Sequence, residues 1–184
     1  MNNPLNFILF QVGWFACVYP AAHGLEWVGP LVTLGIVALH LVLTPGALRA
    51  RYARWLAGVA LIGWTLDSGF KLLGVTSYPT SDSWLAPVWI LSLWLLFALT
   101  VHHSLYWLHR FPKVTVLFGL IGGPLAYYSG VRMGATGFAH APWVSFLGLG
   151  IEYAVLTPWL LRAASAAHWA PLRREETQTL PNNS

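Results

Sequence analysis

The sequence predicts an all-α membrane protein, a bundle of six transmembrane helices with both termini in the cytoplasm. Hydrophobic residues make up 57% of its 184 residues and charged residues only 9%, whereas a soluble domain has about 45–50% apolar and about 25% charged residues. So few charges cannot cover a water-exposed surface, and so much apolar side chain excludes disorder. β-barrel strands alternate apolar and polar residues, and the apolar runs of this chain are continuous.

Six apolar stretches have the ~17–25 residues that a helix needs to cross a bilayer. In order along the chain, we expect helices over 5–22, 27–44, 55–75, 85–107, 114–131 and 143–164. Turn-forming residues separate them: Pro45-Gly46 follows the second stretch, Tyr78 to Asp82 the third and Pro112 the fourth. We therefore expect a single transmembrane domain over 1–170 and a polar cytoplasmic tail over 171–184.

The orientation follows from the basic residues, which favour cytoplasmic loops. Eight of the ten lie between the second and third stretches, between the fourth and fifth, or at and after the end of the sixth: Arg49, Arg51, Arg54, Arg110, Lys113, Arg162, Arg173 and Arg174. No Lys or Arg precedes the first stretch, as a cleaved signal peptide would require, so we expect this helix to be retained. The location predicted is the bacterial inner membrane, crossed several times.

The third stretch carries two charged residues, Asp67 and Lys71, four positions apart on one helical face. Charged side chains at membrane depth are costly and usually face the interior of the bundle. One interpretation is an internal ion pair that joins neighbouring helices. In another, Lys71 extends outward to the membrane surface, and Asp67 then stands alone as a binding or proton-handling group.

Glu152 lies about ten residues into the sixth stretch and has no partner within that stretch. We expect its partner to be Lys71, Arg132, a histidine or, for a protonated side chain, a backbone carbonyl. Its predicted depth makes it the strongest single candidate for a functional residue.

The fifth stretch contains Gly122, Gly123 and Pro124, followed by Tyr127. These residues predict a kink or a break in the fifth helix, of the kind that forms binding sites in several transporters. The alternative is close helix packing through Gly119 and Gly123, which have the spacing of a small-residue contact motif.

Three histidines, His40, His102 and His103, fall in the cytoplasmic halves of the second and fourth stretches. They form a weak alternative site for a metal ion or a b-type haem, but their spacing is not diagnostic of either. Histidines that hydrogen-bond to loops or lipid headgroups are the simpler interpretation, and we expect no cofactor.

Nucleotide-binding and hydrolase motifs are absent from the sequence. Asp67 and Glu152 could form an acid–base pair if the fold brings them together. With a net charge of +4 and only 16 charged residues, the balance fits membrane orientation and not a nucleic-acid partner.

The chain resembles a family of small bacterial inner-membrane proteins classified as a domain of unknown function. The resemblance rests on Pro87 to Thr100, His103-Ser104-Leu105, the run Gly122 to Gly130, Gly134-Ala135, Gly13-Trp14-Phe15 and the helix of Asp67. The chain departs from the family pattern at His102, where the resemblance implies Asn, and this weakens any site that needs both neighbouring histidines. The resemblance also implies genes beside relatives of cyclopropane-fatty-acid synthase and flavin amine oxidases, and hence lipid-modifying enzymes as partners.

Two functions are compatible with these residues. The first is binding or movement of a lipid or small amphipathic molecule at an intramembrane polar site built from Asp67, Lys71, Glu152, Tyr127 and His103. The second is a membrane-embedded enzyme, or enzyme subunit, that acts on acyl chains. Membrane lipids are the expected partners in both, and a homo-oligomer is compatible with either.

Overall fold

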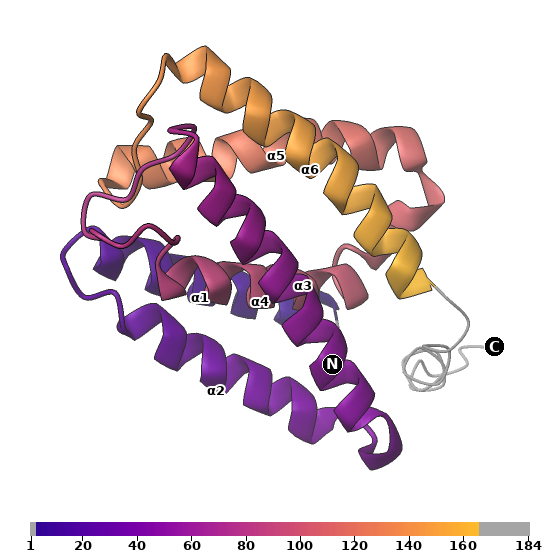
Figure 1. Ribbon diagram of the computed structural model, residues 1–184. Coiled ribbons are helices and arrows are strands. Elements are labelled where there is room, and N and C mark those ends of the chain that lie inside the picture. The colour runs from indigo at the N-terminus through magenta and orange to yellow at the C-terminus, as the bar shows by residue number, and fades with distance from the viewer. Residues whose placement is uncertain (1–2, 166–184) are drawn as a thin grey trace.

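The computed structural model describes residues 3–165, which form six α-helices, one short 3-10 helix and no β-strand (Figure 1). The helices are α1 (Asn3–Ala21), α2 (Val28–Leu43), α3 (Gly46–Leu72), α4 (Val88–His102), the 3-10 helix η1 (Tyr106–Arg110), α5 (Pro112–Met133) and α6 (Pro142–Ser165). The predicted all-α class is confirmed. Three helices, α1, α5 and α6, are long and apolar enough to cross a membrane. The predicted polar tail, 171–184, lies outside the described residues.

Two helix ends differ clearly from the predicted ones. α3 begins at Gly46 and not near residue 55, because arginines are good helix formers and the Arg49 guanidinium donates to the carbonyls of Val42 and Thr44, each at 3.3 Å, at the end of α2. α4 ends at His102 and not near residue 107, because His103 leaves the helical region with φ −123° and ψ −95° and the chain turns into η1.

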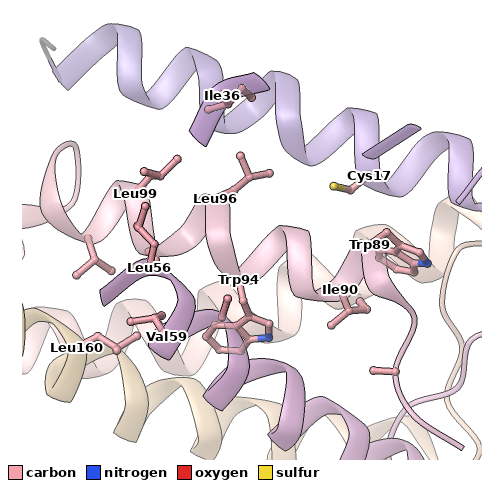
Figure 2. Packing of buried hydrophobic residues seen from close by; sticks show 14 of the residues in the cluster. Cys17, Ile36, Leu56, Val59, Trp89, Ile90, Trp94, Leu96, Leu99 and Leu160 are labelled. Carbon is pink, nitrogen blue, oxygen red and sulfur yellow. The ribbon is translucent and has the colours of Figure 1, made fainter. Parts of the chain in front are cut away.

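The short helix α4 lies at the centre of the bundle and is covered by α1, α2, α3 and α6. Its side chains project to opposite sides (Figure 2). Leu96 points toward α1 and α2 and fills the space beside Gly13, where a Cβ would lie 2.6 Å from a Leu96 methyl group. Trp94 points toward α3 and α6 and stacks on Tyr153, with 5.2 Å between ring centroids.

The loops gather at two ends of the bundle. Those joining α1 to α2, α3 to α4 and α5 to α6 lie together at the left of Figure 1, and the other connections and the end of α6 lie opposite. Ser77 and Gly137 exchange two backbone hydrogen bonds of 2.8 Å, and the Thr80 hydroxyl donates to the Glu26 carboxylate. A chain that crosses a membrane repeatedly must place its successive loops at opposite ends of the bundle, as here. That all six helices cross the membrane remains a prediction.

The outer faces of the helices carry large exposed apolar side chains. Phe7, Ile8, Val12 and Phe15 of α1 are each at least 50% exposed, and Val155 of α6 is 68% exposed. Contiguous apolar surface of this extent is unfavourable in water but not in hydrocarbon. The arrangement therefore fits helices that face lipid.

The predicted break in the fifth helix is wrong, because α5 runs without interruption through Gly122, Gly123 and Pro124. The alternative of close packing is confirmed. A Cβ at Gly119 would lie within 3 Å of the Tyr153 carbonyl carbon, and one at Gly123 would collide with the Tyr153 ring. These two glycines allow α6 to lie directly against α5. A kink without a break stays a prediction.

Candidate functional site

Asp67 is the centre of a buried hydrogen-bond cluster formed by α3, α4 and α5. Its side chain has no exposed surface. The Trp94 indole N–H donates to Asp67 Oδ2 at 2.6 Å, and the Tyr127 hydroxyl donates to Asp67 Oδ1. One carboxyl group thus accepts a hydrogen bond from each of two other helices.

The position of Trp94 is set by the residues on both sides of its ring. Gly63 of α3 lies against one side, where a Cβ would collide with the indole. The Tyr153 ring of α6 stacks on the indole with an interplanar angle of 17°. The indole is thereby held between two helices with its N–H directed at Asp67.

Of the two interpretations of Lys71, the ion pair with Asp67 is wrong, and the outward direction of the side chain agrees with the structure. The Lys71 ammonium group points away from the bundle and donates to the carbonyls of Ser81 at 3.0 Å and Leu85 at 3.2 Å, and to that of Ser83. Lys71 lies in the last turn of α3, where its side chain reaches the loop more readily than the interior. It therefore fixes the α3–α4 loop and takes no part in the cluster.

Glu152 of α6 lies close enough to Asp67 for the two carboxyl groups to interact electrostatically. Both of its oxygens are buried, and they have no hydrogen-bond partner among the described residues. The structure therefore brings Glu152 near the cluster without bonding it there. An ionised carboxylate in such surroundings is costly, so the geometry favours the neutral acid.

Tyr78, in the α3–α4 loop, covers the cluster from the loop side. It is 4% exposed, and its ring packs edge-on against Trp89 with centroids 5.8 Å apart. Burial, with Asp67 nearby, raises the pKa of the Tyr78 phenol well above its usual range. Tyr78 is thus a neutral hydroxyl buried near Asp67.

A cavity of about 440 Å³ adjoins the cluster. The cavity lies mainly between α1, α4 and α5. Its floor is α4, where Trp89, Ile90 and Trp94 are at most 2% exposed, and its rim includes Phe7 and Phe118, which are 51% and 40% exposed. This gradient of exposure indicates a groove that opens sideways between α1 and α5.

Of the predicted site residues, Asp67, Tyr127, Gly122 and Gly123 line the cavity, whereas Lys71, Glu152, His103 and Pro124 do not. Asp67 is fully buried there and accepts hydrogen bonds from Trp94 and Tyr127. Sequence reasoning missed Gln11, an exposed amide in the middle of α1 that also lines the cavity. The sequence does contain a signal for it, because Gln11 is an amide side chain within the otherwise apolar first stretch.

The histidines belong to a second polar cluster at the other end of the bundle, centred on Asn6. Asn6 is 1% exposed, and its carbonyl oxygen accepts from the Ser104 hydroxyl at 2.7 Å. His40 Nδ1 donates to the Ile36 carbonyl at 2.8 Å, so its Nε2 is the acceptor for the Asn6 amide at 3.2 Å. The His103 Nε2 lies 3.4 Å from the Tyr52 hydroxyl.

This arrangement leaves His40 without a free nitrogen for a metal or haem iron. Among residues 3–165, no group of three His, Cys, Asp or Glu side chains has the geometry to hold a metal ion. A metal or haem site at His40, His102 and His103, the alternative considered from the sequence, would therefore lack His40 as a ligand. The cluster joins α1, α2, α3 and α4 through hydrogen bonds and ring contacts.

The comparisons with known proteins agree with the resemblance found in the sequence. No curated protein and no solved structure matches the chain. Residues 3–159 match the family described as "Protein of unknown function (DUF2878)". This match includes α1 to α5, most of α6 and every residue that lines the cavity. The chain therefore belongs to the DUF2878 family of proteins of unknown function.

Proposed function

We propose that this protein is an inner-membrane protein that binds, or moves, a lipid or small amphipathic molecule in the groove between α1 and α5. The observation that carries the proposal is a cavity of about 440 Å³ lined mostly by aromatic and aliphatic side chains. Ligand sites typically have about 300–1,000 Å³, apolar walls and a few placed polar groups. The groove has this composition, with the Asp67 cluster at its floor.

The lateral opening supports a ligand that comes from the bilayer. The rim residues of α1 and α5 are large, apolar and exposed, so hydrocarbon can reach the groove without crossing a polar barrier. The proposed topology has six crossings with both termini in the cytoplasm. It places the loops around Tyr78 and Gly137 on the periplasmic side.

A second candidate function is an enzyme, or enzyme subunit, that acts on acyl chains. The pair of Tyr127 and Asp67 favours it, because a phenol bonded to a carboxyl group beside an apolar cavity can donate or accept a proton. Whole-cell lipid analysis of a deletion strain separates the two. An altered fatty-acid composition that wild type restores and Tyr127→Phe does not would favour the enzyme.

The binding proposal is tested by native mass spectrometry of the protein after exchange into mild detergent. We expect one bound amphiphile per chain in the wild type and its loss in Gly122→Leu, because this residue lines the cavity and a Cβ there would meet only the Phe118 ring of its own helix. Gly35→Leu is the matched control, since Gly35 is exposed on α2 and a Cβ there meets nothing within 4 Å. Equal lipid retention by all three proteins would contradict the proposal.

A further inference from the structure

We infer that the occupant of the groove is a single linear amphiphile with an uncharged hydrogen-bonding group, and that the Gln11 side-chain amide binds this group. The inference rests on the proposed function and adds the chemical class of the ligand and a binding residue. Three features of the groove carry it: the position of Gln11, the shape of the cavity and its charge.

Gln11 is placed at the centre of the lining face of α1. It is the ninth of the 19 residues in this helix, and Phe7, Phe15 and Val18 line the cavity with it, as positions three, four or seven apart on a helix should. Gly13 and Cys17 face the other way, against α4 and α2. The packing of α1 therefore directs Gln11 into the groove.

The Gln11 amide makes no hydrogen bond within the described residues, although it lies at mid-helix in an apolar segment. Hydrocarbon offers no partner for its two donors and its acceptor. Gln11 thus presents to the groove a hydrogen-bonding group that an occupant can satisfy.

The shape of the groove fits one extended chain. The lining residues run from Phe7 to Val18 on α1 and from Phe118 to Met133 on α5, which correspond to about 16 and 22 Å at ~1.5 Å per helical residue. A volume of about 440 Å³ spread over this length holds a single acyl chain but not a phospholipid with two. A helix from a second copy, about 10–12 Å across, is too thick to enter it.

The charge of the groove selects an uncharged polar group. None of the lining residues is Lys, Arg or His. The single acidic residue, Asp67, is fully buried and already accepts from Trp94 and Tyr127. An ionised phosphate or carboxylate would find no counter-charge there. A hydroxyl or an amide can both donate to and accept from Gln11, and an ester oxygen can accept from its N–H groups.

The test compares photoreactive probes on the full chain reconstituted in phosphatidylethanolamine nanodiscs. The probes are an uncharged monopalmitoylglycerol, anionic palmitate at alkaline pH and a plain hexadecane, each with a diazirine on the chain. We expect the monopalmitoylglycerol to crosslink to peptides of α1, α4 and α5 more than palmitate does. Gln11→Leu should lower its yield by about fivefold, as expected for one lost neutral hydrogen bond, and leave the hexadecane yield unchanged.

Gly122→Leu should lower the yield of all three probes, and the control Gly35→Leu should lower none. If Gln11→Leu leaves the monopalmitoylglycerol yield unchanged while Gly122→Leu lowers it, the inference is overturned and the proposed function stands. If Gly122→Leu has no effect on any probe, both are overturned. If Gln11→Leu instead converts a dimer to a monomer at unchanged probe yield, Gln11 joins two copies and the inference is again overturned.

Discussion

The hydroxyl group of Tyr127 in α5 donates a hydrogen bond to the carboxyl group of Asp67 in α3, a residue 60 positions earlier in the chain. Trp94 of α4 donates the second hydrogen bond to the same carboxyl group. Three helices are thereby tied at one point, directly beneath the groove. Because hydrocarbon cannot replace these donors and acceptors, the cluster fixes how the helices sit around the cavity.

The first prediction concerns the removal of this carboxyl group. Asp67→Ala leaves the Trp94 N–H and the Tyr127 hydroxyl buried without an acceptor. We expect a loss of about 2–6 kcal/mol in the free energy of unfolding, since each of the two unsatisfied buried groups costs about 1–3 kcal/mol. Denaturant titration in detergent micelles, followed by tryptophan fluorescence, measures it. Asp67→Asn keeps one acceptor oxygen and should lose less; equal losses for the two variants would argue against the hydrogen bonds as the cause.

The second prediction uses two glycines of the same helix. Gly63→Ala should prevent correct packing of α3 on α4, because the added methyl group collides with the Trp94 ring. We expect at least about 2 kcal/mol of destabilisation, the usual range for overpacking being ~1–3 kcal/mol. Gly58→Ala is the control, since a Cβ there meets nothing within 4 Å; it should be neutral or stabilise by up to about 1 kcal/mol through helix propensity. The measurement is the melting temperature of each variant. Similar melting temperatures for Gly63→Ala and Gly58→Ala would contradict the packing of Trp94 against Gly63.

The third prediction concerns Glu152, whose carboxyl oxygens are buried without a hydrogen-bond partner among the described residues. Lys71, one of its predicted partners, is bonded to the α3–α4 loop. Glu152→Gln keeps the shape of a neutral acid and should therefore change the free energy of unfolding by less than about 1 kcal/mol. A loss of about 3–5 kcal/mol, as seen when one partner of a buried ion pair is removed, would show an ionised Glu152 with a cationic partner. Complementation of a deletion strain by the same variant shows separately whether function needs the acid.

The fourth prediction concerns topology. The natural Cys17 is buried, at 1% exposure, so it should not react with a membrane-impermeant maleimide. Asp82→Cys, in the α3–α4 loop, should be labelled in intact spheroplasts. Lys113→Cys, exposed at the start of α5, should be labelled only after the membrane is opened. Labelling of both from the same side would refute the alternating arrangement.

The composition, together with the Pro, Gly and charged residues between the apolar stretches, was sufficient to predict the all-α fold class and the approximate positions of the helices. The ends that were missed depend on tertiary contacts. The polar stretch from Arg49 to Arg54 resembles a loop, yet it is helical and Arg49 binds the last carbonyls of α2. The end of α4 at His102 is set partly by Asn6, which accepts a hydrogen bond from the Ser104 backbone N–H at 3.3 Å across 98 residues.

The candidate site was predictable only in part for the same reason. Asp67 and Tyr127 are recognisable in the sequence as polar groups at membrane depth. The role of Trp94 depends on how α3 packs against α4, which neither helix specifies by itself. The sequence left two positions open for Lys71, paired with Asp67 or extended outward, because helical spacing says which face a residue occupies and not how far a long side chain extends. Gln11 carries no charge and was passed over, although an amide in an apolar helix also requires a partner.

The most direct test of the central claim is an experimental structure of the protein in lipid nanodiscs. The account predicts an elongated density in the groove between α1 and α5 that passes Gly122 and contacts the Gln11 amide. A structure in which α1 packs directly against α5, with the groove closed and Gln11 bonded to another part of the protein, would contradict it.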